Sequence, residues 1–226
     1  MKFLLDSSQA CIQDRACELV AGQLLTPLTN YANWGGVFAI DNGGYTGFDS
    51  AKFKQVLTKS KPHSDKCLFV AMPDVVGNAR RTAEIFRYRY DLGWVVSGYK
   101  TALVAQDGLE DLDIDWRSVD AIFIGGGDPW KDSNSSLDIV RAAKIMEKHV
   151  HVGRVNTPRR FVRFHDIGAD TCDGSGVVRY SHMLDAIKRE LLGAESRETL
   201  FTGTTHSLEA DQMTPTKKVV AEESQS

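Results

Sequence analysis

The chain has 226 residues, of which 42% are hydrophobic and 25% charged, as is usual for a globular protein with one sizeable core. Its formal net charge of −3 argues against a uniformly basic nucleic-acid-binding protein, although a local basic face would be enough. The four cysteines are scattered without a C-x-x-C pair, which argues against a zinc ribbon and a disulfide framework. The sequence contains neither a signal peptide pattern nor a stretch of membrane-span length, so we expect a cytoplasmic protein.

Short apolar runs alternate with longer helical patterns, which is typical of βα units with a parallel sheet. The runs that predict strands are KFLL (2–5), FAIDNGG (38–44), LFVAMPD (68–74), ALVAQDG (102–108), AIFIGGG (121–127), VHVGRV (150–155) and the weaker GADTCDGSG (168–176). These seven strands are one short of an eightfold barrel. We therefore predict an α/β fold of the (β/α)8 TIM-barrel type, compact or slightly incomplete, with any irregular element within 20–37.

Helical patterns follow most of these strands. We predict helices over 48–60, 78–94 with Asn78 as a plausible N-cap, 113–119, 134–149, 157–168 and 179–192. From about Gly203 the chain becomes polar and aperiodic. The predicted organisation is one barrel domain over 1–203 and a disordered polar tail over 204–226.

Polar or glycine clusters follow five of the predicted strands. They begin at Asp41, Asp74, Gln106, Gly125 and Asp173. Taken singly, each cluster could be an ordinary turn or a helix cap. Their shared position favours function, because catalytic groups of a parallel barrel gather at the carboxyl ends of its strands.

The segment GRVNTPRRFVRFHDIGADTCDGSG (153–176) resembles the tRNA-guanine transglycosylase pattern, with Thr157-Pro158, then a helix, then Gly168-Ala169-Asp170 and Asp173. Upstream, Asp41-Asn42-Gly43-Gly44-Tyr45 is similar to the family's Asp-Ser-Gly-Gly-Phe motif. Val104–Gly108 is similar to its Val-Gln-Gly-Gly segment, and Ile124–Gly127 to its Ile-Gly-Gly-Leu segment. The resemblance covers residues 38–176 in order and implies a (β/α) barrel that exchanges guanine for a 7-deazaguanine.

The resemblance also implies roles for single residues. Asp173 would be the nucleophile that attacks C1′ of the sugar, with Asp170 as a rival, and Asp41 would be the general acid/base. The residues that would bind the base are Asp74, Gln106, Gly125, Gly126, Tyr45 and Met72. No cofactor is expected.

This chain lacks the cysteine cluster of the family's tRNA-acting members and does not keep the Pro-Thr-Arg that usually follows the nucleophile. It resembles more closely the short, zinc-free DpdA-type enzymes of phage and bacteria, which place 7-deazaguanines into DNA. We therefore expect nucleic acid as partner, with DNA favoured over tRNA, and a 7-deazaguanine base as co-substrate. A homodimer or an accessory protein stays open, and a phage protein would work in the host cytoplasm.

A target nucleotide that enters the barrel needs phosphate contacts around the rim. The arginines nearest the predicted site are Arg154, Arg159, Arg160, Arg163 and Arg179. Each alone reads as solvated helix charge, but the cluster indicates a phosphate-contacting edge. A second basic, aromatic stretch over 80–90 is more simply the solvent face of its helix.

Other residues give weaker indications of function. His63, His149 and His151 have no partners at metal-ligand spacing, so we predict no metal site. Trp130 could line the pocket. Three other functions stay open: the same exchange on tRNA, a non-catalytic base-binding subunit, and an unrelated barrel that uses the IGGG turn to bind a sugar phosphate.

Overall fold

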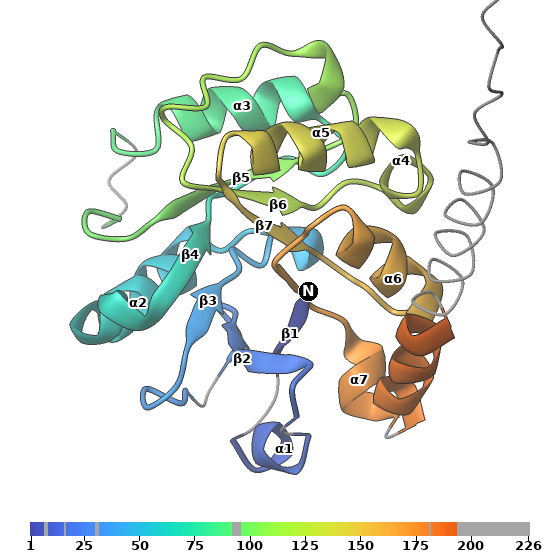
Figure 1. Cartoon of the computed structure of the whole chain (residues 1–226). Helices are drawn as coiled ribbons and strands as arrows, with labels where there is room; N and C mark the ends of the chain where they lie inside the picture. The colour runs from blue at the N-terminus through green and yellow to red at the C-terminus, as the bar shows by residue number, and fades with distance from the viewer. Residues whose placement is uncertain (7–8, 16, 30–31, 92–95, 181, 194–226) are drawn as a thin grey trace, which may run out of the picture.

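The computed structural model describes residues 1–6, 9–15, 17–29, 32–91, 96–180 and 182–193. Eight parallel strands form a closed barrel in which each strand pairs with its neighbour in sequence and β8 pairs with β1 (Figure 1). The strands are β1 (Lys2–Leu5), β2 (Val20–Leu25), β3 (Phe38–Ile40), β4 (Cys67–Ala71), β5 (Thr101–Ala105), β6 (Ala121–Ile124), β7 (His149–Val152) and β8 (Thr171–Cys172). The predicted TIM-type barrel is confirmed. It is complete rather than one strand short, because Val20–Leu25 forms β2.

Helices surround the strands in Figure 1. They are α1 (Gln9–Asp14), α2 (Ser50–Ser60), α3 (Ala79–Arg87), α4 (Asp128–Lys131), α5 (Asn134–Ile145), α6 (Pro158–Asp166), α7 (Ser175–Arg179) and a helix over 182–193. Short 3₁₀ turns lie at Gly44–Thr46, Lys61–Lys66 and Leu109–Asp111. No helix among the described residues is long and apolar enough to cross a membrane.

Local chemistry explains where several helices begin. The Asn78 side chain accepts the N–H of Arg81 and caps α3, and Thr157 caps α6 in the same way through the N–H of Arg160. The helix expected over 113–119 is wrong, since the chain there is irregular and only Leu109–Asp111 forms a helical turn after β5. The predicted helix 134–149 ends at Ile145, because His149 begins β7. The polar tail over 204–226 lies outside the described residues.

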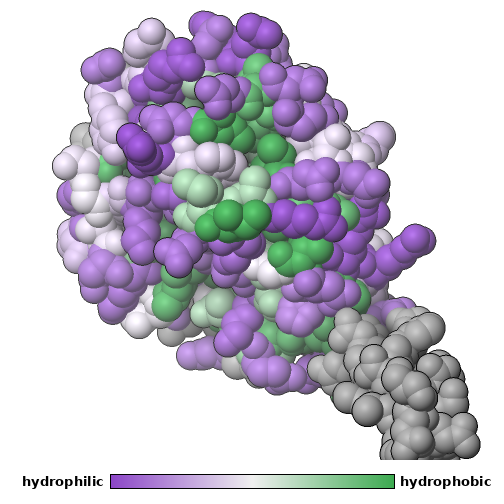
Figure 2. Space-filling view, turned by 45° about the horizontal axis from the view of Figure 1, so that its top comes forward, coloured by the Kyte–Doolittle hydropathy of each residue, from purple (hydrophilic) through white to green (hydrophobic). Residues whose placement is uncertain are grey.

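Side chains alternate between two buried layers. On each strand every second residue faces the interior of the barrel, whereas the others pack outward against the helices. The inner layer contains Leu4, Leu24, Ala39, Phe69, Ala71, Ala102, Val104, Ala121 and Phe123. The outer layer joins strand residues such as Phe3 and Ile40 to helix residues such as Phe53 and Phe161. Polar side chains cover most of the face in Figure 2, and apolar atoms gather toward its middle.

Gly22 allows the backbone of β2 to lie close to the backbone of Val37, directly before β3. A Cβ atom at this position would lie 2.0 Å from the carbonyl oxygen of Val37, which already accepts the N–H of Gln23 at 3.1 Å. We expect Gly22→Ala to lower the free energy of unfolding by about 2 kcal/mol or more, because the backbone of Val37, directly before β3, must move. Chemical denaturation measures this loss.

Gly193→Ala is the matched control, since a Cβ at Gly193 meets nothing within 4 Å. Equal stability of the two variants would contradict the tight β2–β3 contact.

Candidate active site

A cavity of about 500 Å³ opens at the carboxyl ends of the strands. Every strand leads into a residue that lines it: Asp6 after β1, Thr26 after β2, Asp41 after β3, Asp74 after β4, Gln106 after β5, Gly125 after β6, Gly153 after β7 and Asp173 after β8. Most of these residues continue the inward alternation of their strand, as Asp6 follows Leu4 and Asp41 follows Ala39. The barrel therefore brings together residues that are far apart in sequence.

Both carboxylate oxygens of Asp173 have partners in the structure. Its Oδ1 accepts the backbone N–H of Arg154 at 2.8 Å, and its Oδ2 lies 3.3 Å from Nε2 of His151. Its own N–H donates to the carbonyl of Val152 at 3.1 Å, and its carbonyl accepts the N–H of Val155 at 2.6 Å. The side chain is 16% exposed. A carboxylate fixed at both oxygens and still open to a cavity suits a nucleophile.

Asp41 is poised to exchange a proton near neutral pH. Desolvation raises the pKa of Asp41 to about 7, and the negative charges of Asp173 and Asp74 add to the rise. The N–H of Gly43, which donates to Asp41 Oδ1 at 2.9 Å, opposes it. A general acid/base works best with a pKa close to the working pH. Asp41 therefore has the property that its predicted role requires.

Asp74 is held by two amide side chains. Asn42 Nδ2 donates to its Oδ1 at 2.9 Å, and Gln106 Nε2 donates to its Oδ2 at 2.5 Å. Desolvation raises the pKa of Asp74, and both hydrogen bonds oppose that rise. Gln106 is oriented in turn by the N–H of Gly77, which donates to its Oε1 at 2.9 Å. Because each carboxylate oxygen can accept two bonds, Asp74 keeps acceptor capacity for a ligand that presents N–H groups.

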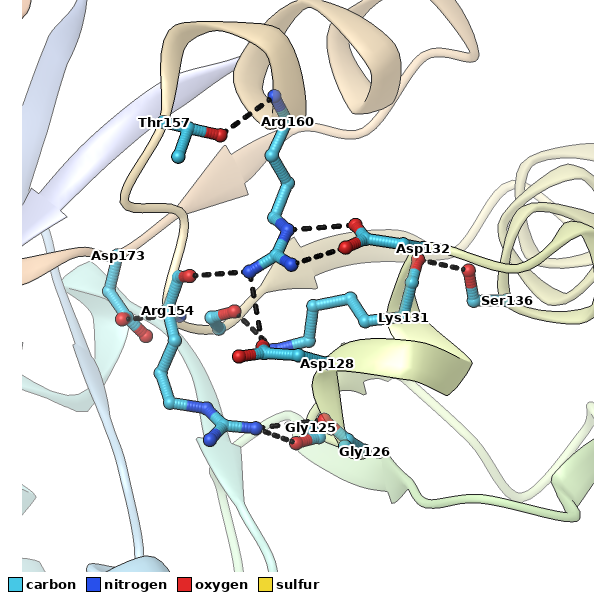
Figure 3. Close-up of polar contacts among 12 residues, drawn as sticks. Gly125, Gly126, Asp128, Lys131, Asp132, Ser136, Arg154, Thr157, Arg160 and Asp173 are labelled. Atoms are coloured by element: carbon cyan, nitrogen blue, oxygen red, sulfur yellow. Dashed lines mark hydrogen bonds and ion pairs between the residues drawn. The ribbon is translucent and has the colours of Figure 1, made fainter.

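Arg154 lies in the loop after β7, and Figure 3 shows its side chain pointing toward the glycine turn after β6. Its Nη2 donates to the carbonyls of Gly125 and Gly126 at 3.0 and 2.8 Å, and its guanidinium lies 4.4 Å from the ring centroid of Tyr45. Its backbone is left-handed, with φ at 59°. A positive φ is uncommon for an arginine and here aims the backbone N–H at Asp173.

A second group of charges supports this turn from behind (Figure 3). Lys131 is fully buried, and its Nζ donates to the carbonyl of Gly153 at 2.6 Å. Desolvation lowers the pKa of Lys131 to about 8, and the positive charge of Arg154 contributes to the shift. Arg160 donates to both carboxylate oxygens of Asp132 at 3.0 and 2.6 Å and pairs with Asp128 at 3.1 Å. These contacts fix the loop that carries Arg154.

Three predicted pocket residues lie outside the cavity lining. Met72 is buried in the outer layer, where its carbonyl accepts Asn42 Nδ2 at 2.7 Å. Gly126 lies against the ring of Trp130, which is itself buried and donates to Glu110 at 2.8 Å. The signal in all three was nearness in sequence to a strand end, which does not say on which side of the backbone a residue lies.

The N–H groups of the glycine turn are occupied. Those of Gly125 and Gly126 both donate to the carbonyl of Ala105 at 3.0 Å, and that of Gly127 donates to Asp107 Oδ1 at 2.7 Å. A phosphate-binding turn needs N–H groups that point at the ligand. This arrangement disfavours the sugar-phosphate alternative, and it also removes Gly126 N–H as a donor to the base.

The rival nucleophile Asp170 lies at the opposite end of β8. Its carboxylate forms an ion pair with Lys144 at 2.8 Å and accepts the N–H of Val150 at 2.7 Å. Asp170 does not line the cavity. The structure therefore brings Asp173, and not Asp170, next to Asp41.

The predicted phosphate-contacting arginines divide into two groups. Arg160 is paired with carboxylates, Arg163 donates to the carbonyl of Ser133 at 3.1 Å, and Arg154 is bonded to the glycine turn. Arg159 and Arg179 are exposed, and only Arg154 and Arg179 line the cavity. Arg179 is thus the best placed of the five for contact with a phosphate at the rim.

Several lining residues were missed by the sequence analysis, among them Asp6, Thr26, Asn42 and Asn156. Asp6 directly follows KFLL, so the same strand-end pattern could have found it. Desolvation raises the pKa of Asp6, so Asp6 joins Asp41 and Asp74 as a cavity carboxylate whose charged form is disfavoured. Across the part of the chain that the structure describes, no group of histidine, cysteine and acidic side chains suits a metal ion.

A scan of protein-family models finds no match for this chain, and a search of curated proteins also finds none. The site must therefore be interpreted from its own geometry.

The raised pKa of Asp41 predicts how the free energy of unfolding depends on pH. Below about pH 4 its carboxyl is protonated in the folded and the unfolded chain alike, whereas between about pH 4 and 7 only the unfolded chain loses the proton. Stability therefore falls as pH rises through this window and stays lower above it. Asp41→Asn removes this penalty, so we expect it to raise the free energy of unfolding by about 4 kcal/mol at pH 8 and by less than about 1 kcal/mol at pH 4.

Denaturant titrations at both pH values measure this difference. Asp49→Asn is the control, because the N–H groups of Lys52 and Ala51 lower the pKa of Asp49 and its substitution should not stabilise the protein at any pH. A pH-independent effect of Asp41→Asn would contradict the raised pKa.

Proposed function

We propose that the protein is a guanine transglycosylase that exchanges guanine in DNA for a 7-deazaguanine base through a covalent aspartyl-sugar intermediate. One observation carries the proposal: a fixed, cavity-facing Asp173 shares one pocket with Asp41, whose pKa of about 7 suits proton transfer. Base exchange without net hydrolysis needs both a nucleophile that holds the sugar and a group that moves a proton.

In the first half-reaction an oxygen of Asp173 attacks C1′ of the target nucleotide. The C1′–N9 bond breaks, its electron pair passes to the guanine, and Asp41 donates its proton to the leaving ring. The products are neutral guanine, an ester between Asp173 and the sugar, and an ionised Asp41.

In the second half-reaction the incoming 7-deazaguanine gives its N9 proton to Asp41. Its N9 attacks C1′, the ester C–O bond breaks, and the carboxylate of Asp173 is regenerated together with the protonated form of Asp41. Atoms and charges balance over the two steps, so neither an oxidant nor an energy source is required.

Asp74 and Gln106 form the surface that would read the base. The remaining acceptor sites of Asp74 suit the N1–H and 2-amino groups of guanine, and the second amide hydrogen of Gln106 suits its O6. Tyr45, which is 69% exposed at the mouth, offers a face on which the ring can stack. Adenine would leave these buried groups unpaired and so be rejected.

The choice of DNA over tRNA rests on the resemblance to the short, zinc-free branch of the family. On either nucleic acid the target nucleotide must leave its stack to reach a cavity at the end of a barrel.

The first test is a base-exchange assay with radiolabelled guanine, in which the protein is given duplex DNA in one reaction and bulk tRNA in another. We expect label to enter DNA and Asp173→Asn to lower the rate by at least about a thousandfold, as removal of a covalent nucleophile does. Asp170→Asn is the matched control, because it removes a carboxylate of the same strand on the far side of the barrel and should retain exchange.

Label that enters only tRNA would support the proposed exchange reaction but contradict the choice of DNA as the substrate. Absence of label in both, with a folded protein, would contradict the proposal and favour a base-binding subunit.

The rim arginines give a separate prediction. Arg179 is exposed and lines the cavity, so Arg179→Gln should weaken DNA binding several-fold and reduce the salt dependence by about one counterion. Arg160→Gln should leave the salt dependence unchanged, because Arg160 is already paired with Asp128 and Asp132. Fluorescence anisotropy at several salt concentrations measures both slopes, and equal slopes would contradict this assignment.

A further inference from the structure

A buried polar line runs beneath Asp173 inside the barrel. His151 on β7 has no exposed surface, yet both of its ring nitrogens have partners. Its Nε2 lies 3.3 Å from Asp173 Oδ2, and its Nδ1 lies 2.9 Å from Oγ1 of Thr171. The same hydroxyl lies 2.8 Å from Nε2 of His149. Four side chains from two adjacent strands thus form one continuous chain of hydrogen bonds.

The surroundings of His151 are apolar. Its ring centroid lies 4.6 Å from that of Phe123 and 5.1 Å from that of Phe69, both in the inner layer of the barrel. Buried polar groups in such surroundings are expensive unless they are hydrogen-bonded. The hydrogen bonds along the line therefore offset the cost of burying its polar groups.

Which group donates in each of these hydrogen bonds follows from the number of hydrogens that each group carries. A carboxylate only accepts, so His151 Nε2 must carry a hydrogen and donate to Asp173. In the form of the ring that has this single N–H, Nδ1 accepts the hydroxyl hydrogen of Thr171. Thr171 has only that one hydrogen, so its oxygen accepts from Nε2 of His149. Desolvation lowers the pKa of His149 to about 4, which agrees with a neutral ring there.

We infer that His151 is a positioning residue that, together with the backbone N–H of Arg154, fixes the plane of the Asp173 carboxylate for attack on the sugar. This inference rests on the proposed function, in which Asp173 is the nucleophile. A carboxylate rotates readily about its last side-chain bond, and one donor on each oxygen stops that rotation.

Thr171→Val tests the direction of the line, because valine has the shape of threonine without the hydroxyl. We expect ¹⁵N spectra of the full chain to show His151 as the Nε2–H tautomer, and we expect Thr171→Val to keep that tautomer but to shift the Nδ1 resonance, because Nδ1 loses its hydrogen-bond partner. Asp173→Asn should shift the same two nitrogens. An Nδ1–H tautomer in the unmodified protein, or nitrogens that neither substitution shifts, would overturn the inference.

Exchange kinetics test the consequence. Thr171→Val should lower kcat about tenfold and leave KM for the nucleic acid unchanged, since it disturbs orientation and not binding. Thr101→Val is the matched control: Thr101 is also a buried strand threonine, bonded to Arg89 and Asp120, but it lies at the opposite end of β5 from the cavity. A similar loss of stability with unchanged kcat is expected for this control.

His151→Gln and His151→Phe separate positioning from packing. Glutamine keeps an N–H that can reach Asp173, whereas phenylalanine keeps the aromatic contacts and lacks the donor. We expect the glutamine variant to retain several-fold more activity than the phenylalanine variant, and the reverse order would overturn the inference. If the unmodified protein exchanged no base at all, the proposed function would fail, and the ¹⁵N shifts would still decide whether His151 and Asp173 are coupled.

Discussion

The alternation of side chains along closed, parallel strands is the constraint on which the rest of this structure depends. Because every second residue faces inward, an inward residue near the end of a strand is followed two positions later by one that faces the cavity. Thr171 beneath Asp173 and Phe123 beneath Gly125 are two examples. A shift of one residue in the register of β8 would turn Asp173 toward the helices and remove it from the site. The register of β8 therefore decides whether Asp173 can take part in the chemistry of the site.

The cavity concentrates negative charge in a place that hydrates it poorly. Desolvation raises the pKa values of Asp6, Asp41 and Asp74, so each disfavours its ionised form in the folded protein. Such an arrangement lowers stability and persists where a ligand supplies the missing hydrogen bonds or where a proton must move. The surrounding scaffold compensates with fixed donors, from the backbone of Arg154 to the amides of Asn42 and Gln106.

Strand-end patterns predicted the barrel and most of the charged groups of its cavity, because apolar runs followed by Asp or Gly are visible in one dimension. The strand Val20–Leu25 escaped notice since Gly22 and Gln23 interrupt its apolar pattern. Gln23 is nevertheless buried, and its Oε1 accepts the N–H of Asn33 at 2.8 Å. The role of His151 was equally invisible, because its partners Thr171 and Asp173 belong to the next strand and only the β7–β8 register brings them together. Ion pairs such as Arg160–Asp132 likewise join segments that sequence patterns treat separately.

Closure of the barrel by its first and last strands has a consequence for biosynthesis. Lys2 and Phe3 pair with Thr171 and Cys172, so β1 has no partner on that side until almost the whole described chain has been made. A nascent chain up to β7 is an open sheet with two unpaired edges, which is the kind of intermediate that aggregates. Contacts between such distant segments also form slowly, because the loop that they close is long. Asp173 directly follows β8, so the proposed nucleophile is synthesised together with the strand that closes the barrel.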